Sequence, residues 1–352
     1  MKELELTIGM QRFNEESFES YVHKSEQKKV KADLSLGVLN PENRSSRYSD
    51  PNFTRFKNEV SKYLDVNINQ ISIGSGIDST LEILPQIFVG DIVISSPEFP
   101  RFKELGIRYN REIHDVSRSN NNNFEFDDST IEGILEHMNE EQKIVMISTS
   151  NNPTGQVLSL EYISQLVDRA QERHFLVLDM AYGEFAGVDY VNEVAKIASE
   201  NENVLALFTM SKARGLAGKC RLGYGISSKG IAKQIEDYRL PFTPSGESVA
   251  IRSLKNPYKL NRAIKGARKK QQFIESIVDS NFNLEMVRNS KTNIALIRGT
   301  SFDLGDYLMT HGIKTSPHPW IKDSNNESLS YTRITLGNWW SVRKLGNRLK
   351  KI

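Results

Sequence analysis

The amino-acid sequence predicts an α/β protein built on a mainly parallel β-sheet with helices on both faces. Continuous apolar runs at residues 143–148, 175–179 and 204–208 are typical of strands that are buried on both sides. Amphipathic segments of helical length separate such runs, and one of them, residues 160–173, follows Ser159, which can cap its first turn. Sheets of this kind bind ligands at the carboxyl ends of their strands.

The other elements follow from the same periodicity and from the turn residues between them. The asparagine run at residues 120–123 is expected to be an exposed loop. We expect helices at about residues 53–63, 77–84, 100–109, 160–173 and 258–280, and strands at 71–73, 91–94, 111–116, 143–148, 175–179, 204–208, 221–226, 294–297 and 332–336.

A composition break at residues 241–246, Pro-Phe-Thr-Pro-Ser-Gly, divides the chain. We expect a large α/β domain at residues 46–245 and a small α+β domain at residues 246–352. An N-terminal arm at residues 1–45 is expected to join the small domain.

Composition and charge exclude several classes of protein. The 352 residues include 46 basic and 44 acidic ones, a net charge of +2, without a block of one sign, so nucleic acid and membranes are not expected partners. The one cysteine, Cys220, cannot form an internal disulfide, which fits a reducing compartment. No apolar run reaches membrane length, and the N-terminus has no signal core. We therefore expect a cytoplasmic protein.

Three predicted strand ends carry residues suited to chemistry. Lys212 stands where a strand ends, and a buried ammonium there is costly unless its pKa falls, which favours Schiff-base formation; the alternative is a surface loop lysine. Asp179 follows four apolar residues, so its carboxylate needs a cationic or hydrogen-bonding partner. A Schiff-base lysine with a carboxylate on a pyridinium nitrogen is the pairing that pyridoxal phosphate requires.

Four motifs together resemble the fold-type-I pyridoxal-phosphate enzymes. They are the Asn-Pro-Thr-Gly turn at residues 152–155, the Asp-x-x-Tyr pair at 179–182, the Ser-Lys-x-x-Gly-Leu-Ala-Gly loop at 211–218 and the Arg-Ile-Thr-Leu-Gly segment at 333–337. The subgroup they resemble comprises histidinol-phosphate aminotransferase and threonine-phosphate decarboxylase. The resemblance implies a mainly parallel seven-stranded sheet between helices, with a smaller α+β domain.

The resemblance also implies a role for each residue around the cofactor ring. Lys212 would form the Schiff base and then move the substrate α-proton, and Asp179 would pair with the pyridine nitrogen. Tyr182 and Asn152 would hydrogen-bond the phenolic oxygen. Phe99 matches the aromatic residue stacked on the ring, although it also suits an ordinary core position.

The cofactor phosphate would rest on backbone amides of Gly76, Ile77 and Asp78 at a helix N-terminus, with Ser211 and Arg221 completing the cradle. A plain tight turn is the alternative reading of the glycine pair at residues 74–76.

The resemblance implies that the remaining residues bind the substrate or reach the active site of the other subunit. Tyr48 resembles a tyrosine that reaches the phosphate from the other subunit, which implies a homodimer with shared active sites. Arg333 would grip the substrate carboxylate through a bidentate fork, unless it is a solvated strand arginine. Asn40 matches a segment that covers the site.

The sequence departs from the family pattern in two places. The step from Lys212 to Arg221 is one residue longer than in most relatives, so either Arg221 or Lys219 could serve the phosphate, and we expect Arg221. In the small domain Ser316 stands where histidinol-phosphate enzymes carry an arginine, which weakens the case for histidinol phosphate as substrate.

The resemblance implies a pyridoxal-phosphate-dependent aminotransferase that moves an amino group between an amino acid or related amine and a 2-oxo acid. A decarboxylase of the threonine-phosphate type uses the same electron sink and stays open as an alternative. A non-catalytic cofactor-binding module is a third possibility, but such a protein is expected to lack the lysine or the aspartate, and this chain has both. We expect no metal ion in the site.

Overall fold

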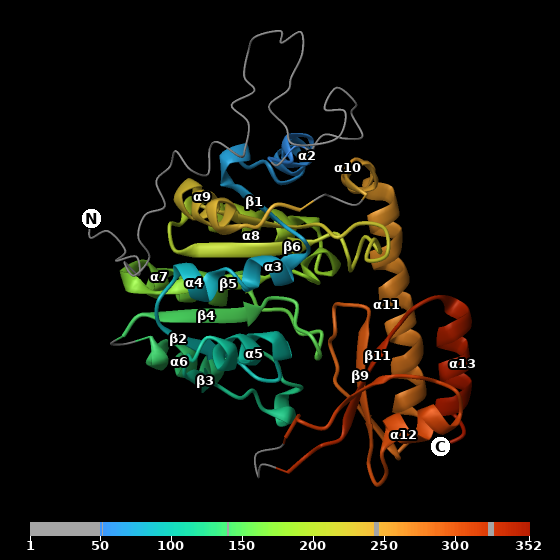
Figure 1. Cartoon of the computed structure of the whole chain (residues 1–352). Coiled ribbons are helices and arrows are strands. Elements are labelled where there is room, and N and C mark those ends of the chain that lie inside the picture. The colour runs from blue at the N-terminus through green and yellow to red at the C-terminus, as the bar shows by residue number, and fades with distance from the viewer. Residues whose placement is uncertain (1–49, 51, 139–140, 243–245, 323–326) are drawn as a thin grey trace, which may run out of the picture.

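The computed structural model describes residues 50, 52–138, 141–242, 246–322 and 327–352. Within them, helices flank a large sheet, and a smaller sheet with its own helices lies beside it (Figure 1). The predicted α/β fold is confirmed. The predicted arm at residues 1–45 lies outside the described residues, and the domain boundaries stay a prediction.

The large sheet has seven strands in the order β1-β7-β6-β5-β4-β2-β3. Its pairings are parallel from β3 to β6, and only β7 runs antiparallel to both of its neighbours. The strands are β1 (Ile71–Gly74), β2 (Asp91–Ile94), β3 (Ile113–Asp115), β4 (Lys143–Ser148), β5 (Phe175–Asp179), β6 (Val204–Thr209) and β7 (Gly223–Ser227).

Apolar side chains on both faces of this sheet form two cores. Successive strand residues point to opposite faces, so Val145 packs into one core and Ile144 and Met146 into the other. One core is covered by α2 (Thr54–Leu64), α6 (Asp128–His137), α7 (Leu160–Arg173), α8 (Val188–Glu200) and α10 (Glu247–Leu254), and the other by α3 (Ile77–Leu81), α4 (Leu84–Ile87), α5 (Pro100–Arg108) and α9 (Lys229–Tyr238).

The smaller sheet has four antiparallel strands in the order β10-β11-β9-β8. Its strands are β8 (Leu284–Met286), β9 (Ile294–Gly299), β10 (Ser316–His318) and β11 (Tyr331–Thr335), and its helices are α11 (Pro257–Asp279), α12 (Leu304–Thr310) and α13 (Trp339–Leu349). The long helix α11 joins the two parts, because its first half packs on Phe185 and Ala213 of the larger one (Figure 1).

Most expected elements begin and end within about two residues of the observed ones. The helix expected at residues 77–84 is wrong as a single element, because α3 and α4 are separate. Pro85, in the first turn of α4, has no N–H and its ring would clash with a carbonyl one turn earlier, so a continuous helix is not possible there. The asparagine run is also not a plain loop, since residues 120–122 form a short 3₁₀ turn that Ser119 caps; two further 3₁₀ turns are Ile68–Gln70 and Gly183–Phe185.

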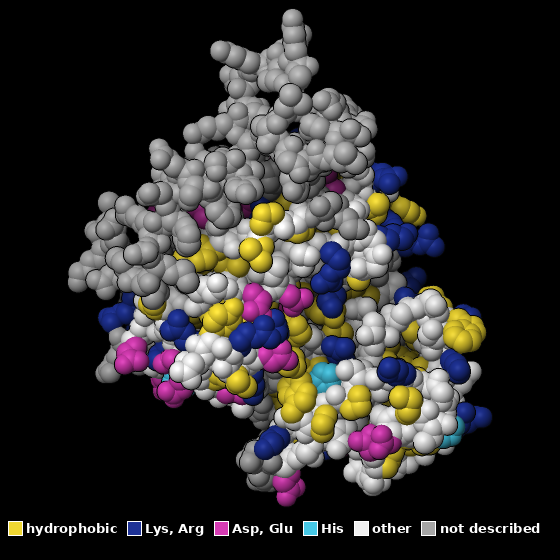
Figure 2. Space-filling view, viewed as in Figure 1, with side chains coloured by type: hydrophobic (Ala, Val, Ile, Leu, Met, Phe, Trp, Pro, Cys, Tyr) yellow, Lys and Arg dark blue, Asp and Glu magenta, His cyan; other side chains and the backbone are white. Residues whose placement is uncertain are grey.

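Two further features concern the helices and the distribution of surface charge. Among the described residues, no helix is long and apolar enough to cross a membrane. On the face shown in Figure 2, side chains of both charge signs are interspersed over the larger part of the molecule.

Candidate active site

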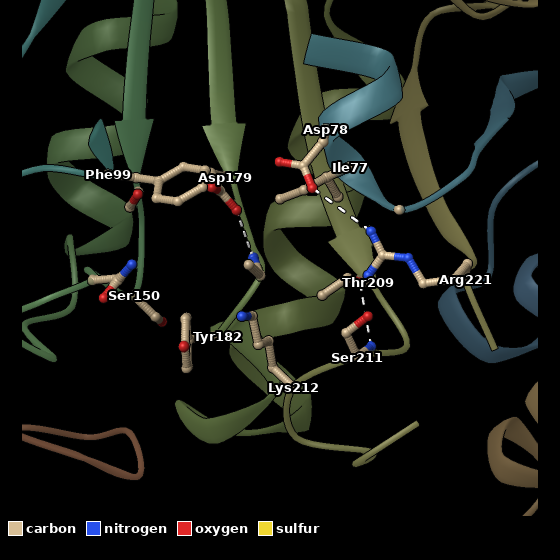
Figure 3. A pocket seen from close by; sticks show the side chains of 14 residues that line it. Ile77, Asp78, Phe99, Ser150, Asp179, Tyr182, Thr209, Ser211, Lys212 and Arg221 are labelled. Atoms are coloured by element: carbon tan, nitrogen blue, oxygen red, sulfur yellow. Dashed lines mark hydrogen bonds and ion pairs between the residues drawn. The ribbon is translucent and has the colours of Figure 1, made fainter. Parts of the chain in front are cut away.

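Three parallel strands bring polar residues to one edge of the large sheet, where β4, β5 and β6 end at Ser148, Asp179 and Thr209. The loops that follow these strands surround one pocket, together with the loops after β1 and β2 (Figure 3). The pocket is lined by Gly76, Ile77, Asp78, Phe99, Ser148, Ser150, Asn152, Asp179, Ala181, Tyr182, Thr209, Ser211, Lys212 and Arg221.

Asp179 is the acidic group at the base of the pocket. The residue is only 3% exposed, and its Oδ1 accepts a hydrogen bond of 2.7 Å from the backbone N–H of Ala181. Burial raises the pKa of Asp179 to about 7; the Ala181 N–H and the charge of Lys212 oppose this, while the charges of Glu98 and Asp78 add to it. A cation against this carboxylate would therefore favour its ionised form.

Lys212 faces the same pocket from the loop after β6 (Figure 3). Its Nζ lies 5.3 Å from the centroid of the Tyr182 ring. The expectation of a lysine buried at the strand end is wrong, because β6 ends at Thr209, the buried side chain of Met210 takes the inward position, and the Lys212 side chain is exposed. Lys212 and Asp179 nevertheless line one pocket.

Arg333 reaches this site from the smaller sheet. Its Nη1 donates a hydrogen bond of 2.7 Å to Oδ1 of Asn152, which lines the pocket. Its Nε is buried and has no hydrogen-bond partner in the described part of the chain. Arg333 is therefore not a freely solvated strand arginine, since it joins the smaller sheet to the loop after β4 that lines the pocket.

Close backbone approach shapes the far end of the pocket. Gly76 has φ +75°, and a Cβ at Gly223 would lie 2.6 Å from the carbonyl carbon of Gly76, so β7 can pass this turn only without a side chain. Above the turn, Nη2 of Arg221 lies 3.9 Å from Oδ2 of Asp78. The buried Ser211 Oγ has no hydrogen-bond partner among the described residues. This end thus presents a guanidinium, a hydroxyl and backbone amides.

The structure bears on two alternatives that the sequence left open. Arg221 lines the pocket and Lys219 is not among the lining residues, so the longer step after Lys212 still brings the arginine to the site. Phe99 fits both the ring-stacking position and a core position. It lines the pocket, and it also packs edge-on against Phe102, with ring centroids 5.9 Å apart.

Other predicted residues lie elsewhere. Asn40 and Tyr48 fall outside the described residues. Ser316 lies opposite Arg333 in the antiparallel pairing of β10 and β11, at a second pocket that also contains Lys314. Arg333, the candidate for binding the substrate carboxylate, thus has the Ser316 hydroxyl and the Lys314 ammonium as neighbours at this second pocket.

The sequence analysis missed four residues that line the pocket, Ser148, Ser150, Ala181 and Thr209. Each stands at a strand end or within about two residues of one, which is the signal that could have found them. Ser150 also has a buried Oγ without a hydrogen-bond partner in the described ranges.

A family model and two curated relatives that match this chain are those of aminotransferases. The family model "Aminotransferase class I and II" matches residues 4–301. Histidinol-phosphate aminotransferase of Bacillus subtilis (strain 168) is 29% identical over 275 residues, which are 77% of this chain and 66% of that protein. The enzyme of the same name from Bacillus pumilus is 32% identical over 238 residues, 66% of this chain and 60% of that protein. This chain therefore spans less than two thirds of the length of these relatives.

Two solved structures show the same architecture. The histidinol-phosphate aminotransferase of Sinorhizobium meliloti, in complex with pyridoxal-5'-phosphate, has a TM-score of 0.73 and 25% identity, and covers 87% of this chain and 82% of its own. The L-threonine-O-3-phosphate decarboxylase of Porphyromonas gingivalis has a TM-score of 0.68 and 20% identity, with 87% and 90% covered, and this likeness shows the fold alone.

Proposed function

Since the chain belongs to the class I and II aminotransferase family, as its motifs indicated, we propose that it is a pyridoxal-phosphate-dependent aminotransferase. The reaction we propose moves an amino group between an amino acid or related amine and a 2-oxo acid. The observation that carries the proposal is that Lys212 and Asp179 face one pocket at the strand ends of the large sheet.

The residues of the pocket fit pyridoxal phosphate. The buried carboxylate of Asp179 suits a protonated pyridine nitrogen, and the amine of Lys212 suits an aldehyde. The Ser211 Oγ, which has no hydrogen-bond partner among the described residues, and the Arg221 guanidinium suit a phosphate. They lie at a turn where a Cβ on Gly76 would be 3.2 Å from Nη2 of Arg221. An amine, an acid and an anion-binding turn are what this cofactor needs.

The roles we propose for the remaining residues follow from their positions. Phe99 would cover one ring face, while Tyr182 and Asn152 would hydrogen-bond the phenolic oxygen. Arg333, held by Asn152, would bind the substrate carboxylate through two parallel N–H donors.

When bound, pyridoxal phosphate supplies an electron sink for a carbanion at the substrate α-carbon. Asp179 would keep the ring nitrogen protonated. The Nζ of Lys212, as a neutral amine, would act as general base for the substrate α-proton. Backbone N–H groups of residues 76–78, with Ser211, would hold the phosphate in place.

We further propose a cytoplasmic homodimer with shared active sites. The lone cysteine, Cys220, supports a reducing compartment. The homodimer rests on the resemblance of Tyr48 to a tyrosine that reaches the phosphate from the other subunit. The roles of Tyr48 and Asn40 rest on the resemblance alone.

The proposal is tested by adding pyridoxal phosphate to the purified protein, looking for yellow absorbance, and reducing the adduct with borohydride before peptide mapping. A label on Lys212 is expected, and a label on another residue would refute the assignment. Lys212→Ala is the control that should carry no label.

The decarboxylase that the sequence left open is not favoured, because the family model and the curated relatives described above are aminotransferases. A panel of amino acids tested with and without 2-oxoglutarate separates the two, since only transamination consumes a 2-oxo acid stoichiometrically.

A further inference from the structure

A buried glutamate, Glu98, lies next to residues that line the pocket, and its charge adds to the rise that burial causes in the pKa of Asp179. It lies in the loop between β2 and α5 and is only 3% exposed. A carboxylate in such a place is costly unless hydrogen bonds and a countercharge compensate it. Both are present.

The hydrogen bonds of Glu98 join its own loop to the end of β4 and the turn that follows it. Its Oε1 accepts from the backbone N–H of Phe99 at 2.8 Å and from Nδ2 of Asn151 at 3.1 Å. Its Oε2 accepts from the backbone N–H of Ser148 at 3.0 Å. Phe99 and Ser148 line the pocket themselves, and Asn151 precedes the lining residue Asn152.

Asn151 carries this connection into the turn that presents Asn152. The fully buried side chain of Asn151 accepts, through Oδ1, hydrogen bonds from the backbone N–H of Thr154 at 3.1 Å and from its hydroxyl at 2.8 Å. Asn152 in turn holds Arg333. A change at Glu98 can therefore reach the residue proposed to bind the substrate carboxylate.

Burial raises the pKa of Glu98, and the charge of Arg118, which is also 3% exposed, opposes this rise together with the hydrogen bonds from Ser148 and Phe99. Arg118 is therefore a countercharge that offsets part of the cost of burying the carboxylate. Its guanidinium donates to the backbone carbonyls of Ser95 and Pro97 in the loop that carries Glu98, and to that of Phe124 in a separate segment. The loop is thus held by the hydrogen bonds of Arg118 as well as by those of the Glu98 carboxylate.

We propose that Glu98 is a positioning residue of the active site, whose carboxylate sets the place of Phe99 and, through Asn151, of the Asn152–Arg333 pair. This inference rests on the proposed function for its kinetic consequences, although its structural part does not. Glu98 orders the surfaces that meet the cofactor ring and the substrate, and touches neither.

Glu98→Gln is the sharpest perturbation because it keeps the size of the side chain. Three N–H donors converge on the carboxylate, and an amide offers a single acceptor oxygen, so in either orientation at least one buried donor loses its partner. The matched control is Glu132→Gln, an exposed glutamate on α6.

The first measurement needs no cofactor. Hydrogen–deuterium exchange of the unliganded protein is followed in peptides covering residues 96–102 and 148–155. Glu98→Gln is expected to speed exchange in both by about tenfold, the effect of losing a hydrogen bond to a charged group, and Glu132→Gln to leave both unchanged. Unchanged exchange in Glu98→Gln would overturn the proposal.

The second measurement separates positioning from general destabilisation. Glu98→Gln is expected to raise KM for the amino substrate about tenfold and the Kd of pyridoxal phosphate in the same direction, with a smaller change in kcat. In an Asn152→Ala background the same substitution should no longer change KM, because it acts through Asn152. If the two KM effects multiply, the positioning role is wrong.

Two arms keep other failures apart. If Glu98→Gln does not fold, Glu98→Asp takes its place. Aspartate keeps a carboxylate near Arg118, but its shorter side chain moves that carboxylate away from the three N–H donors, so exchange should be faster and KM higher than in the wild type. Wild-type exchange and KM in Glu98→Asp would contradict the proposal. If the wild-type protein binds no pyridoxal phosphate, the proposed function fails, and the exchange experiment alone decides whether Glu98 orders the two segments.

Discussion

Replacing Asp179 by Asn should stabilise the unliganded protein while weakening its hold on the cofactor. Asparagine has the same shape and its carbonyl oxygen can still accept the hydrogen bond from the Ala181 N–H, at 2.7 Å in the native structure. The substitution removes the ionisable group and puts an amide NH₂ in place of one oxygen. The pH-dependent part of its effect therefore isolates the free-energy cost of keeping a charge in this buried position.

The magnitude follows from the pKa of Asp179. Burial raises that pKa from its ordinary 3.8 to about 7. Because the folded state binds the proton more tightly than the unfolded state, the contribution of the group is fully present below about pH 4 and is lost as the pH rises to about 7. At about 1.4 kcal/mol per pH unit, the loss amounts to about 4 kcal/mol.

The assay is urea unfolding of the wild type and Asp179→Asn, both unliganded, between about pH 4 and pH 9. The free energy of unfolding of the variant minus that of the wild type should increase by about 4 kcal/mol up to about pH 7 and stay constant above pH 8. A difference that does not change with pH would refute the reasoning.

Adding pyridoxal phosphate should make the wild type more stable than Asp179→Asn, the reverse of the order expected without cofactor. With pyridoxal phosphate bound, a ring cation at Asp179 favours the ionised carboxylate, so ligand binding stabilises the wild type more than Asp179→Asn. The shift of the unfolding midpoint on adding cofactor measures this. An equal shift in both proteins would show that the carboxylate does not meet the ring nitrogen.

Three further outcomes are expected. Arg221→Ala should weaken pyridoxal phosphate binding about tenfold in an absorbance titration, whereas Lys219→Ala should not, and equal effects would mean that the wrong cation was assigned. Arg333→Lys should raise KM for the amino substrate about tenfold with a smaller change in kcat, since one ammonium cannot form the bidentate fork; a change confined to kcat would contradict carboxylate binding. Phe175→Ala should lower the free energy of unfolding by about 3–5 kcal/mol in urea titrations, because the Phe175 ring is fully buried and stacks on the Phe88 ring, with centroids 3.7 Å apart. A loss below about 1 kcal/mol would be inconsistent with this packing.

Local sequence was sufficient for most elements of the large sheet. Strands β2, β4 and β5 and helix α7 begin and end at the expected residues, because continuous apolar runs and a serine cap are local properties of the chain. The helix after Gly76 was predicted less well, since Pro85 breaks it within an otherwise helical pattern.

The sequence by itself determined which chemical groups stand at the strand ends. Asp179 and Lys212 follow apolar runs in neighbouring parallel strands, so the topology alone places them at one sheet edge. The resemblance of their motifs to a known family, which the family match bears out, then indicated the class of reaction.

Only the tertiary structure decided which side chains face the pocket and which support it. Arg333 meets Asn152 across 181 residues of sequence, and Glu98 binds Ser148 and Asn151 from a different loop. It also showed that Lys212 is exposed. These relations depend on how separate elements pack, and the hydrophobic period of a segment carries no information about a partner distant in the chain.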